Sequence, residues 1–173
     1  MKIEIPKPEE LSTYYQSYLK YVTPGDDLLE LIRNQKKETE NFLSAISEEQ
    51  ASSVYAPGKW QLKEVVGHVC DTERIMCYRA LRFSRKDDTP LAGFDENTYI
   101  PGSNYSVRSL KNISEELSSV RGATLSLFGN FSPEMIGLKG IANGNEISVR
   151  ALIFMVYVHQ KHHMKVIREK YLS

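Results

Sequence analysis

Hydrophobic side chains recur along this chain at alternating spacings of three and four residues over several long stretches. The clearest stretch covers residues 26–46, where the apolar positions are Leu28, Leu31, Ile32, Phe42, Leu43 and Ile46. Two aspartates open it, and acidic residues favour the first turn of a helix because the free N–H groups there carry positive partial charge. The pattern predicts amphipathic helices, which we expect over residues 26–46, 62–85, 107–131 and 149–172.

The segments outside these four helices also contain residues that predict local structure. Residues 12–22 contain several tyrosines and predict a short helix that Thr23-Pro24-Gly25 terminates. Asn143-Gly144 is typical of a two-residue β-hairpin turn, and Ser148 is suited to cap the last helix. Residues 86–105 predict a long polar connection, and connections of that length inside a compact domain are often functional.

This order of elements predicts a single domain over residues 1–173. Four long helices joined by mostly long connections indicate the all-α class. The predicted architecture is an antiparallel four-helix bundle with a short N-terminal helix and long crossover connections.

Composition narrows the class of protein further. Hydrophobic residues make up 41% of the 173 positions, and 22 basic residues balance 22 acidic ones. A basic excess, the usual mark of a nucleic-acid-binding protein, is missing. No apolar run approaches membrane-spanning length and the N-terminus does not resemble a signal peptide. We therefore expect a cytoplasmic protein that binds neither nucleic acid nor membrane, in which Cys70 and Cys77 are buried, reduced thiols.

Histidines are concentrated near the C-terminus. Three of the four lie within VYVHQKHHMKVI, residues 157–168. At about 100° per residue, His159 falls at the centre of the apolar face of this helix, His163 lies about 40° away and His162 about 60° to the other side. His159 and His163 thus form an inward-facing i, i+4 pair, the spacing that lets two imidazoles share one metal ion. His162 is expected at the flank of this face or as a hydrogen-bond partner of a metal ligand.

The fourth histidine supplies a candidate third ligand. His68 lies at the edge of the apolar stripe of the helix at 62–85, on one face with Glu64, Asp71, Thr72 and Arg79. The alternative is that the histidines are ordinary hydrogen-bonded residues. Glu64 is also explained as a helix-capping carboxylate, and Asp71 with Arg79 as a solvated ion pair. The spacing alone leaves these alternatives open.

Several segments together resemble the DinB-like family, also called the YfiT or DinB_2 group. They are YAPGKWQLKEVVGHVCDTERIMCYRALRFSR, TPLAGFDENTY and the HxxxH motif in VHQKHHMKVI, and the likeness extends over residues 26–171. Gln61 departs from the Ser or Thr that is frequent in the family at the start of its helix. The resemblance implies a four-helix bundle whose three metal-binding histidines correspond to His68, His159 and His163.

The resemblance also implies an activity. The metal would be zinc, nickel or another divalent ion, and the reaction a hydrolysis or the transfer of a low-molecular-weight thiol to a small-molecule substrate, in an enzyme that is often a homodimer. Glu64, Asp71 and Asp95 are candidate catalytic carboxylates among which the sequence does not choose. The alternative function is that of a non-enzymatic metal- or ligand-binding bundle, such as a sensor or stress-response protein. DNA binding is disfavoured by the neutral charge.

Overall fold

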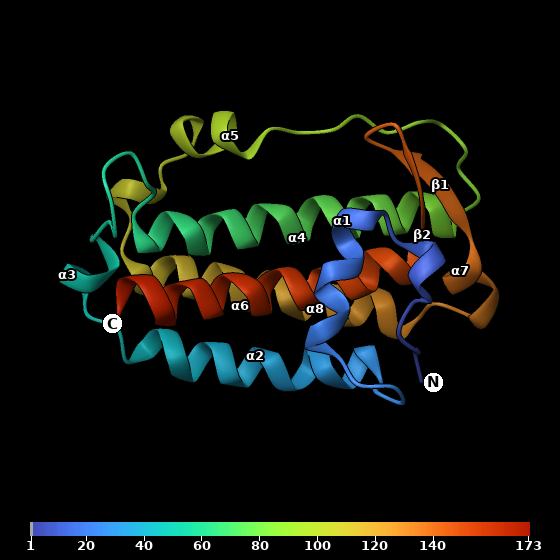
Figure 1. The fold of residues 1–173 in the computed structure, drawn as a ribbon, viewed down its shortest axis with the longest axis horizontal. Coiled ribbons are helices and arrows are strands. Elements are labelled where there is room, and N and C mark those ends of the chain that lie inside the picture. The colour runs from blue at the N-terminus through green and yellow to red at the C-terminus, as the bar shows by residue number, and fades with distance from the viewer. Residues whose placement is uncertain (1) are drawn as a thin grey trace.

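The computed structural model describes residues 2–173 and contains a bundle of four long helices (Figure 1). They are α2 (Leu28–Ser44), α4 (Leu62–Ser84), α6 (Leu110–Gly129) and α8 (Val149–Val166). A short π-helical segment, Ile167–Tyr171, extends the last helix. The predicted four-helix bundle is confirmed. The helix expected from residue 107 begins only at Leu110, because the Ser109 hydroxyl accepts a hydrogen bond from the Asn112 N–H at 3.2 Å and caps it there.

The directions of the helices explain the long connection between two of them. Helices α4 and α6 run one way along the bundle and α2 and α8 the other (Figure 1). Helix α4 packs against both α8 and α6, and α2 packs against the same two helices. The neighbours α4 and α8 are therefore antiparallel, whereas the neighbours α4 and α6 are parallel. Because parallel neighbours cannot be joined by a tight turn, the chain returns along the length of the bundle between them.

This returning segment, residues 85–109, is more ordered than the polar loop predicted for 86–105. It contains helix α5 (Glu96–Gly102) and a 3-10 turn (Tyr105–Val107). Leu91 forms a single parallel bridge with Ala142, which ties the segment to the hairpin described next. The segment thus crosses over α4 and covers one side of it (Figure 1).

The remaining elements lie around the bundle, and α1 crosses its side in front of α8 (Figure 1). They are a 3-10 turn (Pro8–Glu10), α1 (Thr13–Gln16) with its 3-10 continuation (Ser17–Tyr21), α3 (Glu48–Ala51), α7 (Pro133–Gly137), β1 (Lys139–Ala142) and β2 (Asn145–Ser148). The predicted hairpin is confirmed: β1 and β2 pair antiparallel, and Asn143 and Gly144 adopt φ of 51° and 73° at the turn. The Ser148 hydroxyl accepts from the Ala151 N–H at 3.0 Å and caps α8 as expected.

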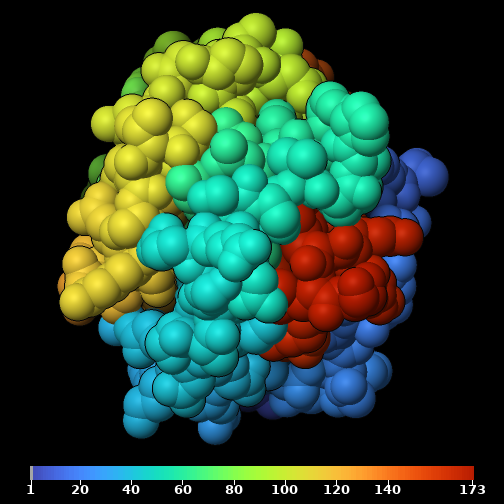
Figure 2. Space-filling model, turned by 90° about the vertical axis from the view of Figure 1, so that its left-hand side faces the viewer, coloured from blue at the N-terminus to red at the C-terminus, as the bar shows by residue number. Residues whose placement is uncertain are grey.

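One end of the bundle is sealed by residues distant in the sequence. Figure 2 shows the C-terminal residues lying beside the connection between α2 and α4. There the Tyr171 hydroxyl donates to the Trp60 carbonyl at 2.8 Å, and the Tyr171 ring packs edge-on against Tyr55. This contact fixes Trp60 next to the start of α4.

The core is mainly apolar and also contains a buried polar network. Ile32, Val66, Ile113 and Leu152 are fully buried, one from each long helix. An ion pair of Arg121 and Glu73, which the sequence did not predict, is buried in the same bundle. Among residues 2–173, no helix is long and apolar enough to cross a membrane.

Candidate metal centre

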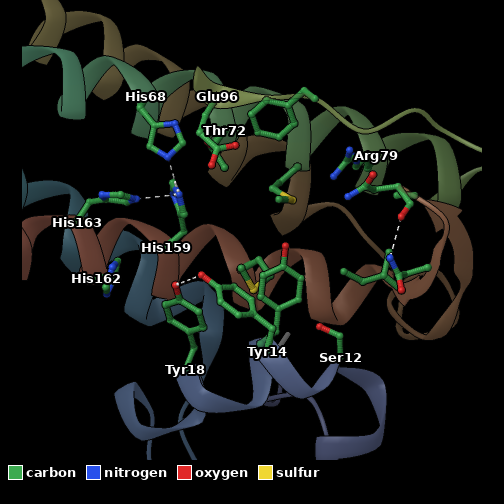
Figure 3. A pocket seen from close by; sticks show the side chains of 18 of the residues that line it. Ser12, Tyr14, Tyr18, His68, Thr72, Arg79, Glu96, His159, His162 and His163 are labelled. Carbon is green, nitrogen blue, oxygen red and sulfur yellow. Dashed lines mark hydrogen bonds between the residues drawn. The ribbon is translucent and has the colours of Figure 1, made fainter. Parts of the chain in front are cut away.

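Three imidazoles from two helices converge beside a pocket. Nε2 of His159 lies 3.1 Å from Nε2 of His68 and 3.2 Å from Nε2 of His163. His159 and His163 are one turn apart on α8, and His68 faces them from α4 (Figure 3). One nitrogen of each ring lies within 4.8 Å of the others, close enough for all three to reach one ion. The antiparallel packing of α4 and α8 is what brings His68 to the pair.

The surroundings keep these imidazoles neutral. Burial, together with the neighbouring histidines, lowers the pKa of His159 well below its usual value. The same causes lower the pKa of His163 to about 3. Burial also lowers the pKa of His68, opposed by the negative charge of Glu96. A neutral imidazole offers a lone pair, and a set of neutral nitrogen donors fits zinc or another divalent transition metal better than it fits calcium or magnesium.

His162 belongs to a different contact. Its Nδ1 lies 3.4 Å from the Tyr21 hydroxyl, and its ring packs edge-on against Tyr18. It is therefore outside the cluster of three, at the flank where its position on the helix placed it, and it fastens the N-terminal segment to α8.

The three histidines border a pocket of about 520 Å³. The N-terminal segment, α4, the crossover segment, the hairpin and α8 all contribute to its lining. Tyr14 and Tyr18 approach it from the N-terminal side, opposite the face of α4 that carries His68 (Figure 3). Trp60 closes the pocket next to His68, with ring centroids 5.2 Å apart. Small molecules would thus reach the imidazoles through a partly aromatic cleft.

None of the three carboxylates nominated from the sequence lines this pocket. Glu64 accepts from the Gln61 N–H at 2.7 Å, so it closes the first turn of α4. Asp71 accepts from the Tyr105 hydroxyl at 2.8 Å and lies 3.7 Å from Arg74. Asp95 accepts from the Asn97 N–H at 2.9 Å and caps α5. The structure therefore accounts for each of them as a local stabilising contact.

The carboxylate that does line the pocket is Glu96, the first residue of α5. Figure 3 shows it on the side of His68 and Thr72. Sequence reasoning missed it because its neighbour Asp95 carried the same charge, and no local pattern tells which of the two turns inward. Asp95 instead caps α5, and the next residue, Glu96, lines the pocket.

Two residues of α4 that the sequence placed on the face of His68 also line the pocket. Thr72 and Arg79 share the face of His68, as the helical positions showed, but Arg79 does not pair with Asp71. Its side chain is buried, with only 7% of the residue exposed, and it donates to the Ala92 carbonyl at 2.9 Å. The crossover segment covers this face, so the solvated ion pair that was the alternative for Asp71 and Arg79 does not form.

The cysteines do not take part in the site. Both are free thiols, as expected, and burial raises the pKa of Cys70 and of Cys77 to about 12. A thiol protonated at neutral pH is a poor nucleophile and a poor metal ligand.

Comparison with known proteins places this site in a family. The model of the DinB superfamily matches residues 31–167. A protein of Oceanobacillus iheyensis, whose name assigns it provisionally to the metal-dependent hydrolases, is 25% identical over 175 residues, which cover 96% of this chain and 90% of that protein.

Solved structures share the fold. YfiT from Bacillus subtilis, described provisionally as a metal-dependent hydrolase with an unusual four-helix bundle topology, superimposes with a TM-score of 0.75 at 16% identity, over 95% of this chain and 91% of YfiT. A mycothiol-dependent maleylpyruvate isomerase gives a TM-score of 0.65 at 14% identity, over 79% of this chain and 58% of the isomerase. At these identities the likeness shows the bundle fold alone.

Proposed function

The chain belongs to the DinB superfamily, and on that premise we propose that it is a metal-dependent enzyme acting on a small molecule. His68, His159 and His163 would hold a divalent ion, with zinc or nickel favoured by nitrogen donors. The observation that carries the proposal is the convergence of three neutral imidazoles at an open pocket. Within residues 2–173, no fourth histidine, cysteine or carboxylate joins their group. Catalytic zinc sites keep such a free position, whereas structural sites use four protein ligands.

The reaction we propose is hydrolysis of a small molecule or transfer of a low-molecular-weight thiol. The names of the relatives support both, because two are provisionally named metal-dependent hydrolases and the isomerase is named as mycothiol-dependent. The two reactions share a first requirement, which is a deprotonated water or thiol. A bound divalent ion would supply it by lowering the pKa of the water or thiol.

The side chains around the histidines suit this chemistry. Glu96 is half-buried and faces the pocket near His68, so we assign it as the base that accepts the proton of the water or thiol. The Thr72 hydroxyl is buried, has no hydrogen-bond partner among the described residues 2–173 and is available to a bound substrate. Trp60 and Tyr18 limit the access of bulk water from two sides.

The test begins with protein purified without an affinity tag and analysed for bound metal. The metal-free, zinc-loaded and nickel-loaded forms are then assayed on esters and amides, and with thiols against electrophilic acceptors. We expect about one ion per chain and turnover only in a loaded form. Metal binding without turnover on any class of substrate would favour the non-enzymatic sensor instead.

A further inference from the structure

Arg79 lies at the other end of the pocket from the three histidines. It follows His68 by 11 residues on α4, which corresponds to about 16 Å along the helix and a rotation of only about 20°. Both side chains therefore face the same pocket, three turns apart, with Thr72 between them (Figure 3). A molecule that occupied the pocket lengthwise would contact all three.

The guanidinium of Arg79 is buried without a counter-charge. Within residues 2–173 it forms no ion pair, and its one hydrogen bond goes to the Ala92 carbonyl. The Phe94 ring lies about 6.0 Å from it. A guanidinium has five N–H donors and stays charged in proteins, so most of its hydrogen-bonding capacity is unused here. Burying a lone charge costs free energy, which a bound anion would offset.

Arg121 provides a comparison within the same chain. It is also buried, but its donors are satisfied by both carboxylate oxygens of Glu73, by the Gln35 and Gln160 side chains and by the Ile32 carbonyl. A structural arginine in this bundle is thus fully paired. Arg79 differs from it in having open donors and a pocket in front of them.

The other charged side chains that line the pocket leave Arg79 available to bind an anion. It is the one lysine or arginine that lines the pocket in the described chain. Three glutamates also line it, but Glu146 pairs with Lys139, and Glu10 accepts from the Ser148 hydroxyl and lies 3.7 Å from Arg150. The third, Glu96, lies towards the histidine end (Figure 3).

We propose that Arg79 is a specificity-determining residue that binds an anionic group, a carboxylate or a phosphate, of the substrate. The substrate class is therefore a small elongated molecule with an anionic group at one end and its reacting group at the other. Placing the reacting group at the histidines rests on the proposed function, whereas the anion site itself does not. The planar fork of arginine suits the two oxygens that a carboxylate or phosphate presents.

The experiment measures anion binding to the metal-free protein, so that no anion binds through a metal ion. Inorganic phosphate, succinate and the neutral analogue succinamide are titrated at constant ionic strength and followed by NMR chemical shifts. The variants are Arg79→Gln, Arg79→Lys and, as a matched control, Arg33→Gln, which removes an exposed arginine of α2. Circular dichroism checks that each variant is folded.

We expect saturable binding of succinate or phosphate by the wild type and by Arg33→Gln, and none of succinamide. Arg79→Gln should weaken it by about tenfold or more, and Arg79→Lys should weaken it less. The relative affinities of succinate and phosphate identify the preferred anion. Equal anion binding by wild type and Arg79→Gln, or no binding by the wild type, would overturn the inference. If Arg79→Gln does not fold, the comparison of Arg79→Lys with the wild type decides.

Zinc binding by the same variants separates this inference from the proposed function. Arg79→Gln should still bind zinc, because the histidines are three turns away. If zinc binding and turnover persist but the wild type and Arg79→Gln bind anions equally, the anion site is wrong and the proposed function still stands. If Arg79 binds anions but no substrate is turned over, the proposed enzymatic function is wrong and the anion site still stands.

Discussion

The ring of Tyr105 lies directly on the backbone of Gly67, so closely that a Cβ at position 67 would overlap the ring. This contact fastens the crossover segment to α4 immediately before His68. The Tyr105 hydroxyl completes it by donating to Asp71.

Gly67→Ala is accordingly expected to destabilise the fold. The added methyl group must displace a ring that is only 4% exposed, and such overpacking costs about 1–3 kcal/mol. Gly122→Ala is the matched control, because position 122 is exposed in α6 with no atom within 4 Å of the new Cβ, and it should stabilise by about 0.5–1 kcal/mol. Urea unfolding of both variants measures the difference; equal effects would contradict the close contact.

Replacing one partner of the core ion pair should be severely destabilising. Glu73 and Arg121 are each 2% exposed, and Nε and Nη2 of the arginine lie 2.8 Å from the two carboxylate oxygens. Arg121→Met leaves the carboxylate buried without its partner and should lower the free energy of unfolding by about 3–5 kcal/mol. The double variant with Glu73→Met should lose less, since no isolated charge remains. If Arg121→Met is as stable as the double variant, removing the isolated carboxylate restores no stability, and the two side chains are not coupled.

His159→Ala should remove the metal and leave the bundle folded. His159 contacts both other imidazoles, so its loss breaks the donor set, whereas the apolar faces of the four long helices supply the core. Elemental analysis tests whether the metal is lost, and circular dichroism tests whether the bundle stays folded. His162→Ala, which lies outside the cluster, should retain the metal. Unfolding of His159→Ala would indicate a structural metal instead.

Glu96→Gln should lower kcat of the loaded enzyme roughly 10²–10⁴-fold if Glu96 accepts the proton, with metal content unchanged. Asp95→Asn is the control, because asparagine caps a helix about as well as aspartate. It should alter kcat little. A larger loss in Asp95→Asn than in Glu96→Gln would return the role to the residue that the sequence nominated.

The buried thiols predict a loss of stability in alkaline solution. An unfolded cysteine ionises near pH 8.5, while burial raises the folded pKa of Cys70 and Cys77 to about 12. The unfolded state therefore releases protons first, and stability is lost as pH rises above about 8.5. Each thiol should contribute on the order of 1 kcal/mol of this loss between about pH 7.5 and 9.5. The variant Cys70→Ala with Cys77→Ala should show a flatter dependence of the unfolding free energy on pH; an equally steep one would implicate other groups.

The sequence by itself determined the local features of this protein. The long helices, the hairpin at Asn143-Gly144 and the inward-facing pair His159 and His163 all follow from periodicity or from turn chemistry, which depend only on near neighbours in the chain. The placing of Thr72 and Arg79 on the face of His68 follows from the same helical geometry.

Only the tertiary structure decided which residues these helix faces contact. The parallel course of α4 and α6 sends the crossover segment over α4, which buries Arg79, turns Glu96 into the pocket and directs Asp71 to Tyr105. It also sets Arg121 against Glu73 across two helices. Such contacts join residues tens of positions apart, and they depend on which helices pack together and by what path the chain connects them. Helical periodicity fixes the direction in which a side chain leaves its own helix, and packing alone fixes its partner.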